Sequence, residues 1–335
     1  MKNYILVIAA TVLCLCGCKG GQSLLPNVSG HAGEVLVVMD KGLWDMEPGA
    51  LVRDSLEAEC PFLPQREKLY DAVQVTPGNF NQMFQLHRNI LIFNVNSGVN
   101  NPGIECVRNR WAAPQLVIYI NAPGPDEACS IFKDNGHQIL AAIEQVERQR
   151  VIDNAEKYQE KALAGAAKDF TGGDMVFPSG WSLKKKTADF MWLSYETTYV
   201  QQGVFIYRYP STGDKRQWSR NSLVAKRNEV LRENVPGMVE GSYMTTSDVL
   251  APGLKYARWK DRKFAELRGL WDVHGDFMGG PFVSHSFYTP DGHDIICMEA
   301  YVYAPKYDKR HYLRQTESLL YSFRWNNEGQ ETSKQ

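Results

Sequence analysis

The sequence predicts an α+β fold of the α/β sandwich type, in two domains that each pack helices against a small sheet, mainly antiparallel or mixed. Three observations lead to this prediction. Short apolar runs typical of strands alternate with amphipathic stretches in the first half of the chain. Strand-like runs separated by turn residues dominate the second half. Between the halves, residues 168–174 contain Gly172-Gly173 and mark a boundary.

Residues 34–163 form the first predicted domain. Val35-Leu36-Val37-Val38-Met39 is a continuous apolar run, which is typical of a strand covered on both faces. Further strands are expected at 69–75, 89–95 and 115–120, and helices at 48–58 and 77–86. A long helix is expected from Pro125 to about Ala164, because acidic residues fill its first turn and an apolar stripe follows.

Residues 164–325 form the second predicted domain, in which an antiparallel sheet packs with helices. Strands are expected at 188–196, 203–209, 258–267, 269–277, 282–289 and 295–304, and helices at 218–232 and 307–323. Pro290-Asp291-Gly292 is typical of a turn between the last two strands. Residues 18–33 are expected to form a flexible tether and residues 326–335 a disordered tail.

The amino terminus follows the pattern of an export signal. Lys2 provides a positive charge, and Tyr4 to Leu15 is an apolar run too short to span a bilayer, which takes about 20 residues in a helix. The junction Leu15-Cys16-Gly17-Cys18 resembles the lipobox of bacterial lipoproteins. This implies that residues 1–17 are a signal peptide and that Cys18 receives fatty acyl chains such as palmitate. Ordinary secretion, with these cysteines present by chance, is the alternative.

The residues after Cys18 bear on location. No Asp stands at the second mature position, where it retains lipoproteins in the inner membrane, and no acidic cluster resembles a surface-export tag. The resemblance therefore implies a cell-envelope protein that attaches to the outer membrane through its lipid and faces the periplasm. The formal net charge of -1 gives no basic field, so nucleic acid is not expected as a partner.

The cysteines after the signal are Cys60, Cys106, Cys129 and Cys297. An oxidising periplasm permits disulfides, and the sequence cannot choose among the possible pairings. The spacing contains no Cys-x-x-Cys, which argues against a redox motif or a structural zinc site. We expect buried free thiols, with one disulfide as the alternative.

The candidate metal ligands are His274, Asp276, His285 and His293, with Asp294 beside them. Imidazole and carboxylate groups brought together by neighbouring strands can bind zinc or another divalent ion. The protein would then be a metal-dependent hydrolase of an envelope polymer. The alternative is that these side chains only form local hydrogen bonds, since no His-Glu-x-x-His spacing is present. No cofactor and no catalytic residue is predicted.

Aromatic residues are abundant, with 8 Trp and 16 Tyr. The candidates for a binding platform in the second half are Trp181, Trp192, Tyr207 and Trp271, and Trp218 lies among them in the sequence. If such rings share an exposed face, they can bind a glycan or a protein partner. Burial statistics favour the other interpretation, in which the rings fill the core.

Several segments carry a family resemblance. They are the lipobox, Val35-Leu36-Val37-Val38, Gly279-Gly280-Pro281-Phe282-Val283, Tyr303-Ala304-Pro305 and Lys309-Arg310. Together they resemble the Bacteroidetes lipoproteins catalogued as domain of unknown function 4837, over nearly the whole mature chain. This resemblance implies an envelope location and no assigned activity.

The second half also resembles the PsbP-like α/β sandwich. The segments are Pro178-Ser179-Gly180-Trp181, Gly203-Val204-Phe205-Ile206 and Leu319-Leu320-Tyr321-Ser322-Phe323. This resemblance implies an antiparallel sheet with helices on both faces, in proteins that act as assembly factors and binding partners. We therefore predict a non-enzymatic envelope lipoprotein that binds or helps to assemble an envelope protein or glycan, with the metal-dependent hydrolase as the alternative.

Overall fold

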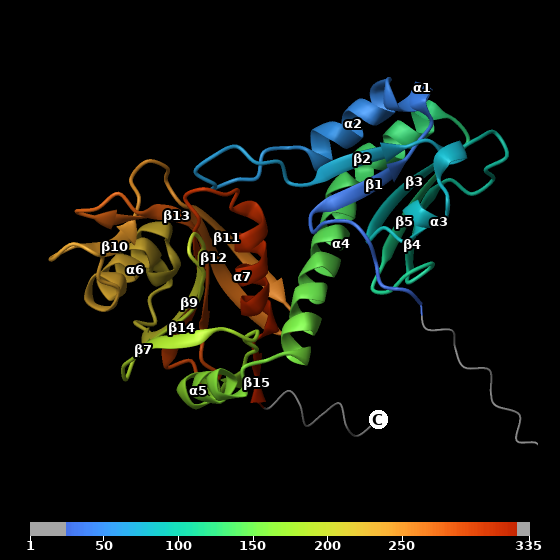
Figure 1. Cartoon of the computed structure of the whole chain (residues 1–335). Helices are drawn as coiled ribbons and strands as arrows, with labels where there is room; N and C mark the ends of the chain where they lie inside the picture. The colour runs from blue at the N-terminus through green and yellow to red at the C-terminus, as the bar shows by residue number, and fades with distance from the viewer. Residues whose placement is uncertain (1–24, 327–335) are drawn as a thin grey trace, which may run out of the picture.

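The computed structural model describes residues 25–326 and arranges them in two domains joined by one long helix (Figure 1). The predicted signal peptide and Cys18 lie outside these residues, as does most of the predicted tail. Both domains combine helices with sheets, so the predicted α+β fold is confirmed. Within residues 25–326, no helix has the length and apolarity needed to cross a bilayer.

The first domain is built on a five-stranded mixed sheet. Its strands are β1 (Glu34–Val38), β2 (Asp71–Val75), β3 (Asn89–Val95), β4 (Gly103–Arg108) and β5 (Leu116–Ala122), in the order β2-β1-β3-β5-β4. The edge strand β4 runs antiparallel to β5, and the other neighbours are parallel. Parallel strands need crossover connections that cover the faces of the sheet. This explains why β1 is apolar at four successive positions.

Helical segments cover both faces of this sheet. α2 (Glu47–Leu56) and the first part of α4 (Pro125–Lys157) pack on one face. Successive residues of a strand point to opposite faces. Val35 therefore enters the core beneath α2 and α4, and Leu36 enters a smaller core on the opposite face. The short helical segments are α1 (Lys41–Trp44), η1 (Pro77–Asn79) and α3 (Gln82–Gln85).

The described part of the predicted tether, residues 25–33, is attached to the first domain, which corrects the prediction for this segment. The backbone N–H of Ser29 donates to the carbonyl of Leu86 (2.8 Å). The backbone N–H of Ala113 donates to the carbonyl of Pro26 (2.9 Å). The sequence did not reveal these bonds because they depend on main-chain groups rather than on an apolar pattern.

The long helix α4 contributes to both domains (Figure 1). It begins at Pro125, since proline suits the first turn of a helix, where its missing N–H has no partner to lose. Ile143 packs in the core of the first domain, and Ile152 packs in a core of the second. The helix ends at Lys157 rather than near Ala164, so the predicted length is wrong.

A separate helix, α5 (Lys161–Thr171), follows α4 and packs in the second domain. It ends where Gly172 adopts φ +80°, a left-handed conformation that costs glycine little. The predicted division between residues 163 and 164 therefore falls inside α5. The two helices read as one in the sequence because no glycine or proline separates them.

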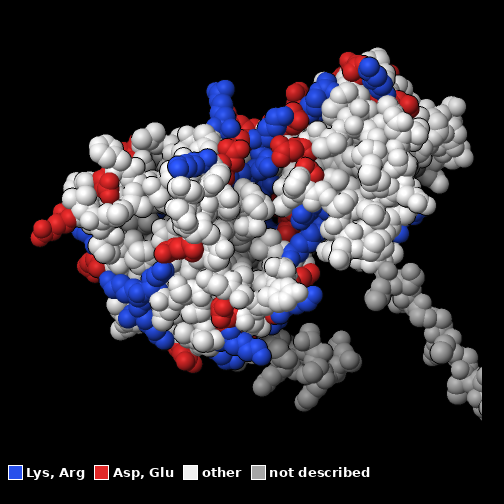
Figure 2. Space-filling view, in the orientation of Figure 1, with Lys and Arg blue, Asp and Glu red and all other residues white. Residues whose placement is uncertain are grey.

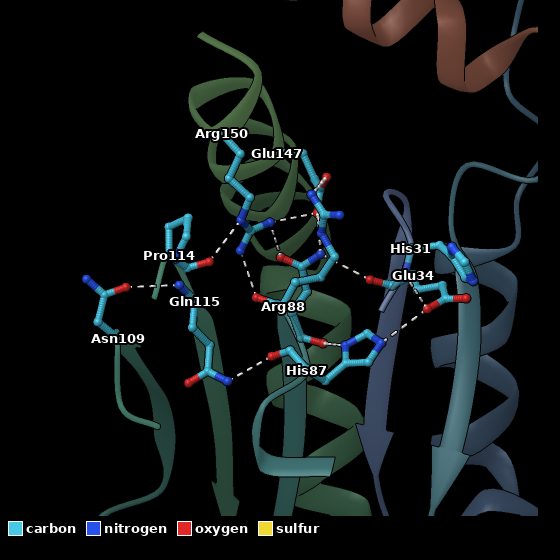
Figure 3. Close-up of polar contacts among 10 residues, drawn as sticks. His31, Glu34, His87, Arg88, Asn109, Pro114, Gln115, Glu147 and Arg150 are labelled. Atoms are coloured by element: carbon cyan, nitrogen blue, oxygen red, sulfur yellow. Dashed lines mark hydrogen bonds and ion pairs between the residues drawn. The ribbon is translucent and has the colours of Figure 1, made fainter. Parts of the chain in front are cut away.

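A buried polar network fixes α4 to the amino ends of the strands (Figure 3). Glu147 on α4 accepts hydrogen bonds from Arg88 Nε (2.9 Å) and Nη2 (2.8 Å) and from Arg150 Nη1 (2.7 Å). Asn89, at the start of β3, donates to Glu147 (2.6 Å) and accepts from Arg150 (3.0 Å). Burial lowers the pKa of Arg150 to about 10, although Glu147 opposes this effect. Glu147 is thus the shared counter-charge of two arginines.

The second domain is built on an eight-stranded antiparallel sheet. Its strands are β7 (Ser182–Lys186), β8 (Phe190–Glu196), β9 (Gln201–Pro210), β10 (Tyr243–Thr246), β11 (Gly253–Trp259), β12 (Arg262–His274), β13 (Gly279–Tyr288) and β14 (Asp294–Tyr303). The main path is β10-β12-β13-β14-β9-β8-β7, and β11 also pairs with β12. A small separate sheet pairs β6 (Gly173–Asp174) with β15 (Arg324–Trp325).

Helices cover both faces of the large sheet, as the sequence predicts. α5, the end of α4 and α7 (Arg310–Ser322) lie over one face, where Val204 and Met298 are buried. α6 (Arg220–Asn234) lies over the other, where Phe205 stacks on Tyr301 with ring centroids 4.6 Å apart. The short segment η2 (Lys215–Trp218) precedes α6.

The two domains meet at the start of α7. The first N–H groups of a helix have no partner within the helix. Glu67, in the loop before β2, accepts hydrogen bonds from the backbone N–H groups of Lys309 (2.7 Å) and Arg310 (2.8 Å). Arg310 also pairs with Asp71 of β2 (2.8 Å). A loop of the first domain therefore caps a helix of the second.

Two glycines of the large sheet allow close packing. A Cβ at Gly280 would lie 2.0 Å from the carbonyl oxygen of Val302, and a Cβ at Gly203 would lie 2.1 Å from the ring of Tyr301. Any larger residue at either position would force the strands or the ring to move. Gly280 thus brings two strands together.

The four cysteines of the described chain are free thiols, as predicted. Cys129 and Cys297 are buried, whereas Cys60 is half-buried and Cys106 is exposed. The expectation of burial is therefore correct for only two of them. Burial raises the pKa of Cys297 to about 11, so this thiol stays protonated at neutral pH.

Candidate functional site

The four predicted metal ligands do not converge, which corrects the sequence prediction. β13 runs between a turn near Gly275 and a turn near Gly292, at its opposite ends. His274 and Asp276 lie at the first turn, His293 and Asp294 lie at the second, and His285 lies within the strand, fully buried. A strand of this length separates its two ends by roughly 30 Å, at about 3.4 Å per residue. One ion cannot bind residues from both turns.

The residues at the turns have local partners. His274 stacks on Tyr243, with ring centroids 5.0 Å apart. The Asp276 carboxylate accepts from the backbone N–H of Phe277 (2.6 Å). The alternative interpretation, local hydrogen bonds and packing, describes these side chains better than metal ligation.

The four predicted binding aromatics do not form an exposed platform. Trp181 (8% exposed), Tyr207 (3%) and Trp271 (2%) are buried, and Trp192 is half-buried. Trp181 belongs to the core beneath α7, and the other three belong to the core beneath α6. The Trp271 indole Nε1 donates to the carbonyl of Val302 (3.2 Å). The core-filling interpretation is therefore correct for these residues.

A groove on the second domain does expose aromatic rings, but different ones. Trp218, Tyr256 and Tyr288 line an opening of about 640 Å³. Tyr256 is 70% exposed and Tyr288 is 42% exposed. The Trp218 indole Nε1 donates to the Tyr288 hydroxyl (3.0 Å), and the Tyr256 hydroxyl donates to the Trp218 carbonyl (3.1 Å). These bonds fix the rings relative to one another and leave much of their surface open.

Basic side chains complete this groove. Lys215, Arg258 and Lys263 line it, and its lining residues include no Asp or Glu. Cations gathered without carboxylates create a local positive potential that attracts anions. We call this opening the aromatic-basic groove, defined by the three rings and these three cations.

Strand alternation positions much of the aromatic-basic groove. Tyr256 and Arg258 are two residues apart on β11 and therefore share one face of the sheet. Trp218 ends η2, just before the amino-terminal cap of α6 at Ser219. The sequence analysis noted Trp218 but missed Tyr256 and Tyr288. The available signal was the spacing of Tyr256 and Arg258, because residues two apart in a strand lie on the same face of the sheet.

A second cavity lies between the domains, where charged side chains of both signs gather (Figure 2). Its volume is about 490 Å³, and Arg88, Glu147, Arg150 and Trp181 contribute to its lining. Arg150 already donates to the carbonyls of Pro114 (3.0 Å) and Arg88 (2.7 Å), and both guanidinium groups donate to Glu147. The charged groups of this cavity therefore already bind one another and hold α4 in place. The aromatic-basic groove is the stronger candidate for a ligand site.

Comparison with known proteins matches each domain to a family model. The second domain matches domain of unknown function DUF4837. That match covers residues 160–322, and a second domain of unknown function, DUF8532, matches residues 28–156. The DUF8532 match ends at the end of α4, and the DUF4837 match begins just before α5. The resemblance to family 4837 is thus confirmed for the second domain, whereas the first domain matches a different model.

The match to solved structures is weaker. A crystal structure from Bacteroides thetaiotaomicron is similar at 9% sequence identity, with a TM-score of 0.22, over 47% of this chain and 46% of that chain. This chain therefore spans about half the length of that protein. Among curated proteins, none matches this chain.

Proposed function

We propose that this chain is an envelope lipoprotein, attached to the outer membrane through Cys18 and facing the periplasm, that binds an acidic glycan in the aromatic-basic groove. The observation that carries the proposal is a set of three mutually fixed rings, two exposed and one half-buried, beside three cations, with no carboxylate among the lining residues. The lipobox supports the location.

The chemistry of the groove fits such a ligand. The C–H faces of sugar rings pack on aromatic faces, and the phenol and indole groups offer a large surface with little conformational freedom to lose. Carboxylates of uronic acids accept charge-assisted hydrogen bonds from arginine and lysine. Tyr256 and Arg258, adjacent on one strand face, can contact a ring and its carboxylate together.

The lining residues favour binding over catalysis. General acid–base chemistry usually takes a histidine or a carboxylate within hydrogen-bond reach of the substrate. The aromatic-basic groove offers neither among its lining residues, and its one serine, Ser286, is buried. We therefore propose that the protein holds its glycan without transforming it.

Removal of one aromatic face should weaken binding. Tyr256→Ala is expected to weaken the binding of a galacturonic acid tetramer about fivefold, since an aromatic contact contributes about 1 kcal/mol. Lys263→Glu should weaken it at least as much, because attraction becomes repulsion. Isothermal titration calorimetry at low salt measures both effects, and added salt should weaken binding to the native chain.

Matched variants test the place of binding. Phe277→Ala removes a fully exposed ring from the turn between β12 and β13, and Lys41→Glu makes the same charge change on the first domain. Both should leave the affinity unchanged. The proposal is wrong if a neutral maltotetraose binds as tightly as the acidic tetramer, if neither sugar binds, or if Phe277→Ala weakens binding as much as Tyr256→Ala does.

The anchor has a separate test. Cys18→Ala is expected to move the protein from the membrane fraction to the soluble fraction, since each buried CH₂ of an acyl chain contributes about 0.8 kcal/mol. Cys16→Ala, two residues earlier in the lipobox, should leave the protein in the membrane fraction. Cell fractionation and mass spectrometry of the mature amino terminus measure this. An intact Met1, or membrane attachment of the Cys18→Ala variant, would contradict the proposed anchor.

A further inference from the structure

Three side chains from distant parts of the sequence meet beneath α7, on a face of the large sheet. Glu266 of β12 and His285 of β13 are directly opposite in the strand register, and Glu317 reaches them from α7. One ligand atom from each lies within 4.8 Å of the other two. Nε2 of His285 and Oε2 of Glu266 are 3.7 Å apart. We call these three residues the Glu-His-Glu cluster.

His285 is the unusual member of this cluster. It is fully buried, yet neither ring nitrogen has a hydrogen-bond partner. The rings of Phe264 and Tyr321 flank it, with centroids 4.1 Å and 4.7 Å away. A buried polar atom without a partner costs about 1–3 kcal/mol, so native proteins rarely leave one. An uncharged imidazole has one ring nitrogen with a free lone pair, so a ring whose nitrogens both lack a hydrogen bond has a lone pair available to a ligand.

Cations orient the two carboxylates of the cluster. Glu266 Oε1 accepts from Arg268 Nε (2.5 Å), and Lys255 Nζ lies 3.0 Å from the same oxygen. Arg268 also donates to Glu317. Oε2 of Glu266 lies 3.7 Å from His285 Nε2 and also accepts a hydrogen bond from the Tyr321 hydroxyl (3.4 Å). Hydrogen bonds of this kind hold carboxylates in place in established metal sites.

An ion-pair network alone does not explain the cluster. Arg268 bridges Glu266 and Glu317 and accounts for their burial without any further group. It offers nothing to His285, however, whose two ring nitrogens would stay buried without a hydrogen bond. A divalent ion would give the imidazole a partner and use the oxygen of Glu266 that faces it.

We propose that Glu266, His285 and Glu317 bind a divalent ion of the zinc class. One imidazole nitrogen and two carboxylate oxygens are a donor set that zinc accepts. Zinc bonds of about 2.0–2.1 Å place tetrahedral ligand atoms about 3.3 Å apart. The separation of 3.7 Å between His285 and Glu266 therefore needs only a small closure.

One member of the cluster borders a cavity. Glu317 lines a small cavity of about 40 Å³ between α4 and α7, together with Arg148 and Arg314. A cavity of this volume holds a water molecule. Glu317 is thus the member of the cluster that borders the space between the domains, whereas Glu266 and His285 do not line this cavity. The inference does not rest on the glycan proposal, because the aromatic-basic groove lies outside this cavity.

Zinc titration of the mature full chain tests the inference. After treatment with a chelator and its removal, the native protein should bind one zinc ion per chain in calorimetry, and elemental analysis after dialysis should find the same ratio. Zinc should raise Tm. His285→Ala should lose the bound ion and the shift in Tm, and Glu317→Gln should weaken binding at least tenfold. If His285→Ala does not fold, Glu317→Gln, which keeps the shape of the side chain, decides the question.

The exposed histidines provide the matched control. His274→Ala and His293→Ala, combined in one variant, should bind zinc as the native chain does, because both side chains lie far from the cluster. The inference is overturned if the native chain binds no zinc. It is also overturned if the double variant loses the ion while His285→Ala keeps it, since the binding would then belong to surface histidines.

Discussion

Glu299→Leu is expected to lower the free energy of unfolding by about 3–5 kcal/mol, the largest effect of any single substitution considered for this chain. The substitution removes the only carboxylate that Arg227 contacts among the described residues and leaves a guanidinium group buried in the core beneath α6. Arg227 is 1% exposed and Glu299 is 0% exposed, so water cannot replace the lost partner.

The geometry of this pair explains the size of the effect. Arg227 Nε and Nη2 donate to the two oxygens of Glu299 at 2.8 Å and 2.7 Å, a bidentate pair. Nη1 donates to the Thr246 hydroxyl (2.9 Å), and the guanidinium lies 3.8 Å from the ring centroid of Phe282. Burial raises the pKa of Glu299, and the charge of Arg227 opposes that rise. The charge of Arg227 therefore offsets part of the cost of burying this carboxylate.

Urea unfolding with a double-mutant cycle measures the effect. Arg227→Leu should cost as much as Glu299→Leu, whereas the double variant should recover most of the loss, because no charge is then left unpaired. Lys226→Leu and Glu229→Leu remove an exposed pair on the same helix and should each change stability by less than about 1 kcal/mol. If Glu299→Leu unfolds no more easily than Glu229→Leu, the buried pair is not charged as described.

The strands were the most predictable part of the fold. Apolar runs such as 89–95 and 295–304 correspond closely to β3 and β14, since burial on one or both faces leaves a periodic pattern. β4 (Gly103–Arg108) was missed because its edge position permits exposed charged residues such as Glu105. The strand order was not predictable, because pairing depends on contacts between residues far apart in the sequence.

The candidate sites were also hard to predict, because they too depend on contacts between residues far apart in the sequence. The sequence analysis named His285 as a candidate metal ligand, but it grouped His285 with residues at the turns. Had the hairpin turn been placed near Gly275, the register would have set Glu266 opposite His285. No pattern could have identified Glu317, because α7 reaches the sheet only through tertiary packing. Likewise, alternation shows which aromatics share a face but not which face a helix covers.

Glu147→Gln is the second substitution with a large expected effect. We expect it to lower the free energy of unfolding by about 2–3 kcal/mol, because it removes the negative charge that Arg88 and Arg150 share. Both arginines are mostly buried, with side chains 16% and 7% exposed, so solvent only partly compensates. The amide of glutamine keeps the shape of the side chain but cannot accept from both guanidinium groups and Asn89 through two oxygens.

Glu144→Gln is the matched control, one turn earlier on the same helix. Glu144 pairs with Arg148 at 2.7 Å, but its own side chain is 46% exposed, so the change should cost less than about 1 kcal/mol. Because α4 packs in both cores, loosening its attachment to β3 should also raise amide hydrogen exchange along β3 and the middle of α4. Equal stability of the two variants in urea would mean that Glu147 is not the shared counter-charge. If amide hydrogen exchange rises only in α7, the loss of Glu147 loosens the second domain rather than the attachment of α4 to β3, and the prediction is wrong.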